Sequence, residues 1–293
     1  MIDKGGSIVP ALVFFHCPAI IGYRNCLVRI RQIRRARQSP GCGGKRMKFV
    51  EYGTDKDDVI ILLHGGGLAP WNYYEEAELL KDKYHIMIPV LDGHSGSDRS
   101  FTTIEENASE IIAYIDEKCS GSVLMIGGLS LGGQILVEML SQRKDICRFA
   151  IIESALVLPM RITSVLIKPT LSLFFPLVKK RWFARMQFDA LHIKKEYFDK
   201  YFCDSATVTK ENMIAFLMAN SAYEIKHSLS ACRAKVLVFV GGKEANIIKQ
   251  SAKIIHGKIQ NSSLEIIPGY YHGDLSINHS ESYIKKMVAL MTD

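Results

Sequence analysis

The residues best suited to chemistry lie in the segment 122–133, SVLMIGGLSLGG, where a serine stands in the pattern G-x-S-x-G. An apolar run, Val123–Ile126, precedes the pattern and predicts a buried strand. An amphipathic run, Gln134–Arg143, follows it and predicts a helix. A sharp turn between strand and helix lifts a serine hydroxyl above the edge of the sheet, with a strained backbone at that serine. We therefore predict that Ser130 is a nucleophile. The alternative is a glycine-rich turn that carries an incidental serine.

A serine nucleophile needs a base, and two histidines have the right position for one. Only His272 and His279 follow the last predicted strand, Leu264–Ile267, and so can reach its carboxyl end. His272 lies in a turn-rich loop directly after that strand. His279 lies near the start of the predicted terminal helix and is the weaker candidate. We predict that His272 is the base.

The base needs an orienting carboxylate, and two glutamates qualify. Glu244 follows the predicted strand Lys235–Val240, and Glu153 ends the predicted strand Phe149–Glu153. Both places belong to the same edge of the sheet as the serine. We predict Glu244 as the acid and keep Glu153 as the alternative acid, whose other explanation is a carboxylate that caps a helix or pairs with a lysine. Asp274 is too close in sequence to His272 to reach around its ring.

Three glycines after a histidine, in His64-Gly65-Gly66-Gly67, let backbone N–H groups approach a substrate closely. The N–H groups of Gly66 and Leu131 are the predicted donors to an oxyanion. A phosphate-binding loop is the competing interpretation, but the segment lacks the Gly-Lys-Ser/Thr that completes such a loop.

The elements around these residues alternate between strand and helix. Predicted strands cover Met47–Tyr52, Val59–Leu63 and His85–Val90, in addition to those above. Predicted helices cover about Asn72–Lys83, Ile104–Lys118, Asn246–His256 and Ser280–Met291. This alternation favours a mostly parallel sheet with helices on both faces. It stops between residues 155 and 230, which predict a helical insert. The expected organisation is an α/β core over 47–154 and 231–293, with 155–230 as a helical cap.

The motifs together resemble the α/β-hydrolase family, over roughly Met47–Asp293. They are HGGG at 64–67, GLSLG at 128–132, GGKE at 241–244 and YHG at 271–273, in the order nucleophile, acid, histidine. The loop DGHSGSD at 92–98 is similar to a family segment in which a glycine is usual at Ser95. The resemblance implies an eight-stranded, mostly parallel sheet, although only one clear strand precedes Val59. It places the nucleophile on Ser130, the acid on Glu244, the base on His272 and the oxyanion amides on Gly66 and Leu131.

Charge and cysteine content limit the partners of the chain. Residues 1–46 contain nine basic side chains and one acidic, whereas the remaining residues are almost neutral. We therefore expect no nucleic-acid binding. No uninterrupted run of 18 apolar residues occurs, so we expect no stable membrane insertion. The seven cysteines form no C-x-x-C pair, which disfavours a disulfide framework or a zinc site and favours a cytoplasmic location.

Residues 1–46 are interpreted as a disordered or non-native extension, with a basic membrane-surface or nucleic-acid arm as the alternative. We expect a chain that begins at Met47 to fold and hydrolyse esters, and Met47 to be the natural start.

The expected activity is that of a serine hydrolase that cleaves a small or medium apolar carboxylic ester through an acyl-enzyme intermediate. No metal or organic cofactor is implied. The alternatives are hydrolysis of a thioester, lactone, amide or C–C bond, and a non-catalytic member of the fold that binds a small ligand. The sequence leaves the oligomeric state open.

Overall fold

A single seven-stranded sheet organises the computed structural model, which describes residues 45–292. The strands are β1 (Lys48–Tyr52), β2 (Val59–Leu63), β3 (His85–Val90), β4 (Val123–Leu129), β5 (Cys147–Glu153), β6 (Lys235–Gly241) and β7 (Ser262–Ile267). Their order is β1-β3-β2-β4-β5-β6-β7. Only β1 runs antiparallel to its neighbour, β3. The α/β class and the mostly parallel sheet are confirmed. The eight strands implied by family resemblance are seven within the described residues, because β1 is the one strand there before Val59.

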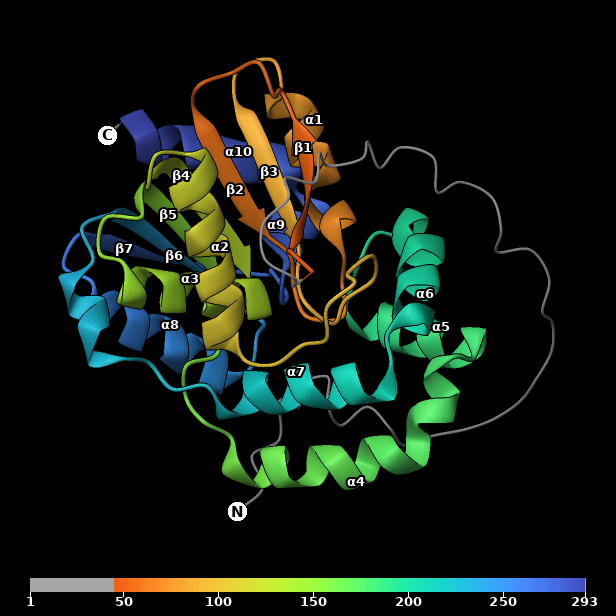
Figure 1. Cartoon of the computed structure of the whole chain (residues 1–293). Helices are drawn as coiled ribbons and strands as arrows, with labels where there is room; N and C mark the ends of the chain where they lie inside the picture. Colours follow the sequence, from red (N-terminus) through yellow and green to blue (C-terminus); the bar gives the residue numbers. More distant parts are fainter. Residues whose placement is uncertain (1–44, 293) are drawn as a thin grey trace.

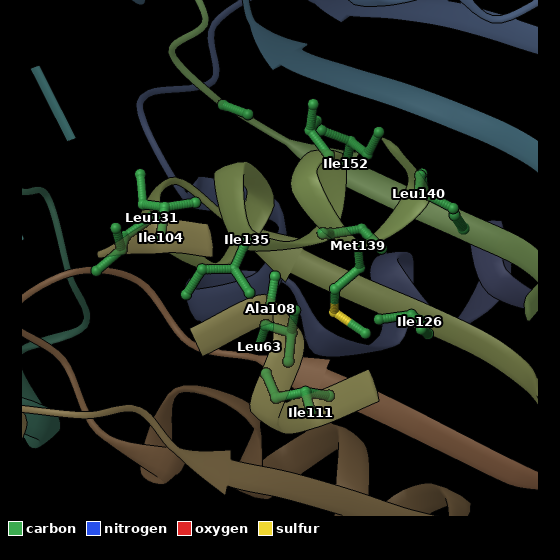
Figure 2. Packing of buried hydrophobic residues seen from close by; sticks show 14 of the residues in the cluster. Leu63, Ile104, Ala108, Ile111, Ile126, Leu131, Ile135, Met139, Leu140 and Ile152 are labelled. Atoms are coloured by element: carbon green, nitrogen blue, oxygen red, sulfur yellow. The ribbon is translucent and has the colours of Figure 1, made fainter. Parts of the chain in front are cut away.

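Helices cover both faces of the sheet (Figure 1). On one face lie α2 (Ile104–Lys118), α3 (Leu131–Gln142) and α8 (Asn246–Lys258); on the other lie α1 (Tyr74–Leu80), α9 (Asp274–Asn278) and α10 (Ser280–Thr292). Successive strand residues alternate between the two apolar clusters: Ile61 and Leu63 face α2 and α3, whereas Ile60 and Leu62 face the other way. Figure 2 shows the first cluster, packed around α3. This period of two is what fixes the register of buried strands.

The helix α2 illustrates how local sequence sets an element. The Thr103 side chain caps its first turn by accepting a hydrogen bond from the Glu106 N–H at 3.0 Å. The buried residues Ile104, Ala108, Ile111 and Ile115 recur at helical spacing along the face toward the sheet. A capped start and a continuous apolar stripe make such a helix predictable. Its bounds are those expected from the sequence.

Four longer helices follow one another between β5 and β6: α4 (Arg161–Val178), α5 (Arg181–Ala190), α6 (Phe198–Thr207) and α7 (Lys210–Ala222). Short 3-10 helices, η3 (Lys195–Tyr197) and η4 (His227–Ala231), connect them to each other and to the core. In Figure 1 these helices lie beyond the carboxyl ends of the strands, with α7 next to the core and α4 packed on the outer side of α7. By length and composition α4 is the one helix within residues 45–292 that could cross a membrane. Arg161, Lys168 and two prolines interrupt its apolar residues.

Several sequence expectations differ from the structure in detail. The helix expected over Gln134–Arg143 is α3, which begins at Leu131 and ends at Gln142, and β4, β5 and β7 are each two or three residues longer than expected. The helix expected over Asn72–Lys83 is a 3-10 turn, η2 (Pro70–Tyr73), followed by the shorter α1. The five-residue α9 was not expected, because one turn is too short to show a periodicity. Cys119, Cys147 and Cys232 are free, as expected, but Cys203 is in a disulfide.

Most of the segment 1–46 lies outside the described residues, so its interpretation as an extension and the start at Met47 stay predictions. Of its last two residues, Arg46 forms an ion pair with Glu117 at 2.6 Å.

Candidate active site

Ser130 stands at the turn between β4 and α3 with a positive φ of 53°. Its N–H donates to the carbonyl of Glu153 at 2.8 Å, which ties the turn to the end of β5. Two flanking glycines allow the close crossing. A Cβ on Gly128 would lie 2.5 Å from the carbonyl oxygen of Gly132, and a Cβ on Gly132 would lie 2.1 Å from that of Leu63. No side chain fits at either position, so the glycines of G-x-S-x-G are a steric requirement here.

His272 and Glu244 are brought together by the loops after β7 and β6. The His272 Nδ1 lies 2.7 Å from Glu244 Oε2. Because Nδ1 carries the proton shared with the carboxylate, the neutral ring has its lone pair on Nε2. The His272 side chain is 34% exposed, so this nitrogen belongs to an accessible ring.

The Glu244 carboxylate is almost fully buried, and three groups donate to it. Besides His272, the Ser154 hydroxyl and the Gly241 N–H both donate to Oε1 at 2.7 Å. Burial by itself would raise the pKa of Glu244, but His272 and these hydrogen bonds outweigh it and hold that pKa below its ordinary value. Burial likewise acts to lower the pKa of His272, and the Glu244 charge outweighs it and raises that pKa. The geometry is that of a carboxylate orienting an imidazole.

Glu153, the alternative acid, has different partners. Its Oε1 accepts hydrogen bonds from the N–H groups of Leu275 and Ser276 at 3.2 and 3.4 Å, at the start of α9. Its Oε2 has no hydrogen-bond partner within residues 45–292. Burial raises the pKa of Glu153 to about 7, and the nearby Glu244 charge adds to that rise. The Glu153 carboxyl therefore joins β5 to the helix that follows the His272 loop, and its backbone carbonyl holds Ser130.

The glycine loop after β2 lies against the start of α3. A Cβ on Gly66 would lie 3.4 Å from Leu131 Cβ, so these two residues are in direct contact. Leu131 is the first residue of α3, and its N–H has no partner inside the helix. Gly65 is fixed by its N–H, which donates to the Asn72 side chain at 3.2 Å. The two residues whose N–H groups are predicted to bind an oxyanion are thus neighbours.

His64 is the first residue of that loop, and its role is structural. The Leu91 N–H donates to its Nε2 at 3.3 Å, and its Nδ1 lies 3.0 Å from the Gly65 carbonyl oxygen. Burial lowers the pKa of His64 to about 3, so the ring is neutral. It links the loops after β2 and β3 and is not available as a base.

One side chain marks where the loops converge. Leu129, next to Ser130, contacts the positions of Gly65 and Gly273: a Cβ on either glycine would lie within 3.4 Å of Leu129 Cδ2. Gly273 is the neighbour of His272. The structure therefore gathers the predicted nucleophile, base and oxyanion loop at one corner of the sheet. The runner-up His279 lies between α9 and α10, with its ring stacked on Tyr270.

A further residue, Asp204 of α6, ties the inserted helices to this corner and was not found by sequence reasoning. Ser95 Oγ donates to Asp204 Oδ1 at 2.6 Å, and Trp71 Nε1 donates to Oδ2 at 2.8 Å. Ser95 is the residue that departs from the family pattern. Its hydroxyl is what the contact with α6 uses, so that departure was the one available signal. No group of histidine, cysteine and acidic residues within 45–292 could hold a metal ion.

Comparison with known proteins gives the class. Residues 60–279 match the Alpha/beta hydrolase family, so this chain belongs to that family. No curated protein matches the chain.

Solved structures of similar fold include an esterase from Thermogutta terrifontis, with a TM-score of 0.68 and 18% identity over 84% of this chain and 94% of that one. A bromoperoxidase from Bacillus anthracis has a TM-score of 0.69 and 17% identity over 84% and 95% of the two chains. A structure from a study of carboxylesterases of Nitrososphaera gargenis has a TM-score of 0.68 and 16% identity, again over 84% and 95%. At these identities the likeness concerns the fold.

Proposed function

We propose that this protein is a serine hydrolase that cleaves a small or medium apolar carboxylic ester through an acyl-enzyme intermediate. The observation that carries the proposal is the Glu244–His272 hydrogen bond of 2.7 Å, placed at the corner where Ser130 projects from a strained turn. A carboxylate, an imidazole and a serine at one sheet corner are the parts that acyl transfer requires. The esterases among the similar folds agree with this chemistry, whereas the bromoperoxidase shows that the fold alone does not decide it.

In the first half of the reaction His272 Nε2 takes the Ser130 hydroxyl proton as Oγ attacks the ester carbonyl carbon. The carbonyl oxygen becomes an oxyanion, and the N–H groups of Gly66 and Leu131 donate to it. The imidazolium is stabilised by the Glu244 carboxylate. When the tetrahedral intermediate collapses, the C–O bond to the alcohol breaks and His272 gives its proton to the departing oxygen.

The second half repeats these steps with water. His272 takes a proton from water as the water oxygen attacks the acyl carbon, and the same two amides hold the new oxyanion. Collapse releases the carboxylic acid, and the proton returns to Ser130. No step calls for a metal or cofactor.

The inserted helices fit the part of a cap over this site. Phe216 of α7 lies at the oxyanion loop: a Cβ on Gly66 would be 3.6 Å from Phe216 Cδ2. Phe216 is buried, and its ring contacts the His94 ring. An aromatic wall beside the oxyanion amides favours an apolar acyl group. The proposed partner is a small-molecule ester. The cytoplasmic location stays a prediction from the cysteine pattern, and the disulfide at Cys203 counts against it.

The test is covalent labelling of Ser130 by a fluorophosphonate, together with hydrolysis of p-nitrophenyl butyrate. Ser130→Ala should abolish labelling and lower kcat by about 10⁶. Ser120→Ala is a matched control, since Ser120 also has a positive φ, 55°, but lies in an exposed turn. A wild-type protein that is folded but unlabelled would instead indicate a ligand-binding member of the fold.

A further inference from the structure

The outer face of α4 is apolar although it faces solvent. Of the eight large apolar side chains exposed within residues 45–292, four lie on α4, namely Ile162, Val165, Leu166 and Leu173, with exposures of 79, 75, 51 and 71%. The exposed Pro169 and Pro176 fall on the same side. We call these six residues the α4 stripe. At about 100° per residue they form one continuous line along the helix.

The opposite face of α4 is apolar as well. Ile167, Leu171 and Val178 are buried on that side, where α4 packs on α7. A helix with apolar residues on two opposite faces normally has both faces covered, by protein or by lipid. In Figure 1 this helix lies at the margin of the molecule, with its outer side uncovered by the other described elements. The α4 stripe therefore has the composition of a contact surface.

Positive charge borders the α4 stripe. Arg161, Lys168 and Lys179 are exposed and fall on one side of it, about two and then about three helical turns apart. Residues 161–190 contain six basic side chains and one acidic, Asp189, whereas the other residues from Met47 onward have 22 basic and 28 acidic. The excess of positive charge in this part of the chain is thus confined to α4 and α5. Trp182, at the start of α5, is 36% exposed next to these cations.

A groove of about 400 Å³ runs along this same basic side. Its walls include Phe175 and Pro176 of α4 and, opposite them, Thr209 and Lys210 at the start of α7. The groove is also lined by Lys179, Lys210 and Glu211, so two ammonium groups and one carboxylate border the apolar wall. Alternation of this kind suits a partner with an anionic head and an apolar tail.

From these features we infer that α4 docks the protein onto the surface of an anionic lipid bilayer. The α4 stripe enters the boundary between headgroups and acyl chains, and the basic side meets the lipid phosphates. The contact is peripheral, since α4 stays packed on α7 through its other face. It does not depend on the proposed hydrolysis. Docking through α4 places the lipid on the outer side of α7. On the inner side of α7, Phe216 lies next to the oxyanion loop.

The experiment is co-sedimentation of the full-length protein with vesicles of about three parts phosphatidylcholine to one part phosphatidylglycerol. Val165→Ser with Leu173→Ser removes apolar surface without adding charge. Lys168→Gln with Lys179→Gln removes charge. Leu79→Ser with Val288→Ser is the matched control, because these two exposed apolar residues lie on α1 and α10. Residues 1–46 are identical in every variant and cancel in the comparison.

Wild type should bind the mixed vesicles, and the α4 apolar variant should bind at least about tenfold more weakly. The lysine variant should bind the mixed vesicles about tenfold more weakly than wild type, and its affinity for pure phosphatidylcholine vesicles should equal that of wild type. The affinity of the control variant for the mixed vesicles should stay within about twofold of that of wild type. Added salt should weaken the binding of wild type. All variants should hydrolyse p-nitrophenyl butyrate like wild type, which separates this result from the fate of the proposed activity.

Three results would overturn the inference. The first is equal vesicle binding by wild type and both α4 variants, or no binding by any. The second is self-association of wild type that the apolar variant abolishes, which would assign the α4 stripe to a second copy of the chain. The third is a loss of thermal stability in the apolar variant without lipid, larger than in the control. That result would show that the stripe already packs within the chain.

Discussion

The ends of β5 and β6 lie side by side in the sheet, and a buried glutamate stands at each, yet the two carboxyls differ in character. Glu153 has its pKa raised to about 7 by burial, whereas the pKa of Glu244 is held below its ordinary value. The difference comes from partners. Glu244 has three donors, one of them an imidazole; Glu153 has two backbone amides on one oxygen and nothing on the other within the described residues. Residue type and strand position therefore do not assign a role. The hydrogen bonds do.

The largest expected effect separates the two glutamates by activity. Glu244→Gln should lower kcat/KM for p-nitrophenyl butyrate by about 10⁴, because an amide cannot stabilise the imidazolium and favours the wrong tautomer of His272. Glu153→Gln should cost less than about tenfold, since glutamine keeps an oxygen that can accept from Leu275 and Ser276. Steady-state kinetics on both variants measures this. The reverse ranking would transfer the role of acid to Glu153.

The pH dependence of the unfolding free energy should show that Glu153, unlike Glu244, is protonated in the folded protein at mildly acidic pH. An unfolded glutamate releases its proton near its ordinary pKa of about 4.5, but folded Glu153 keeps its proton to about 7. The contribution of Glu153 to stability is therefore fully present below pH 4.5 and is lost as the pH rises through 7. Glu153→Gln removes this loss. From pH 4.5 to 8 the variant should gain about 2–3 kcal/mol of unfolding free energy relative to wild type.

Urea unfolding at both pH values gives this difference directly. Glu76 is another buried carboxyl with a raised pKa, and the Glu153 charge contributes to that rise, so Glu153→Gln lowers the pKa of Glu76 and adds to the difference in the same direction. A stability difference that does not change with pH would mean that folded Glu153 is already ionised at pH 4.5.

A smaller effect is expected from the hydroxyl that serves only one of the two carboxyls. Ser154 Oγ donates to Glu244, so Ser154→Ala leaves a buried charge with one donor fewer. We expect kcat/KM to fall by about tenfold to a hundredfold, because a hydrogen bond to a charged group contributes about 1.5–3 kcal/mol. Ser276→Ala is the matched control, since it keeps the backbone N–H that binds Glu153. An equal fall of kcat/KM in Ser154→Ala and Ser276→Ala would contradict the conclusion that Glu244 alone orients His272.

The smallest effect concerns the pH dependence of the residual activity. His272 must be neutral to act as a base, and the Glu244 charge raises its pKa. Activity should therefore rise with pH through the pKa of His272, and Glu244→Gln should move that rise to lower pH. The kcat/KM profile of the variant tests the direction. A shift toward higher pH would contradict the pairing of the two side chains.

The sequence was informative where local signals agree, and it failed where partners are distant. The bounds of β2, β3 and α2 were predicted to the residue, because apolar periodicity and caps act over a few positions. Both glutamates were placed at the correct sheet edge. Glu244 was predicted as the partner of His272, and the hydrogen bond between them agrees. Residue types and spacing could not exclude Glu153, because the choice depends on how the loop after β6 turns Glu244 back onto Gly241 and Ser154.

Asp204 was missed for a related reason. It lies in a helical segment with no pattern that marks it, and its partners Ser95 and Trp71 are more than a hundred residues away. A lone aspartate in a helix is ordinary in sequence. Only the fold reveals that it joins three segments.

The backbone of Ser130 has a consequence for how the chain changes over generations. At a φ of 53° any side chain costs about 1 kcal/mol or more, and glycine avoids that cost. Serine is thus not the most stable residue at position 130, and random mutation to glycine would make the fold more stable. In a lineage that merely bound a ligand nothing would oppose that drift. Under the proposed mechanism, selection for the nucleophilic hydroxyl of Ser130 is what opposes that drift.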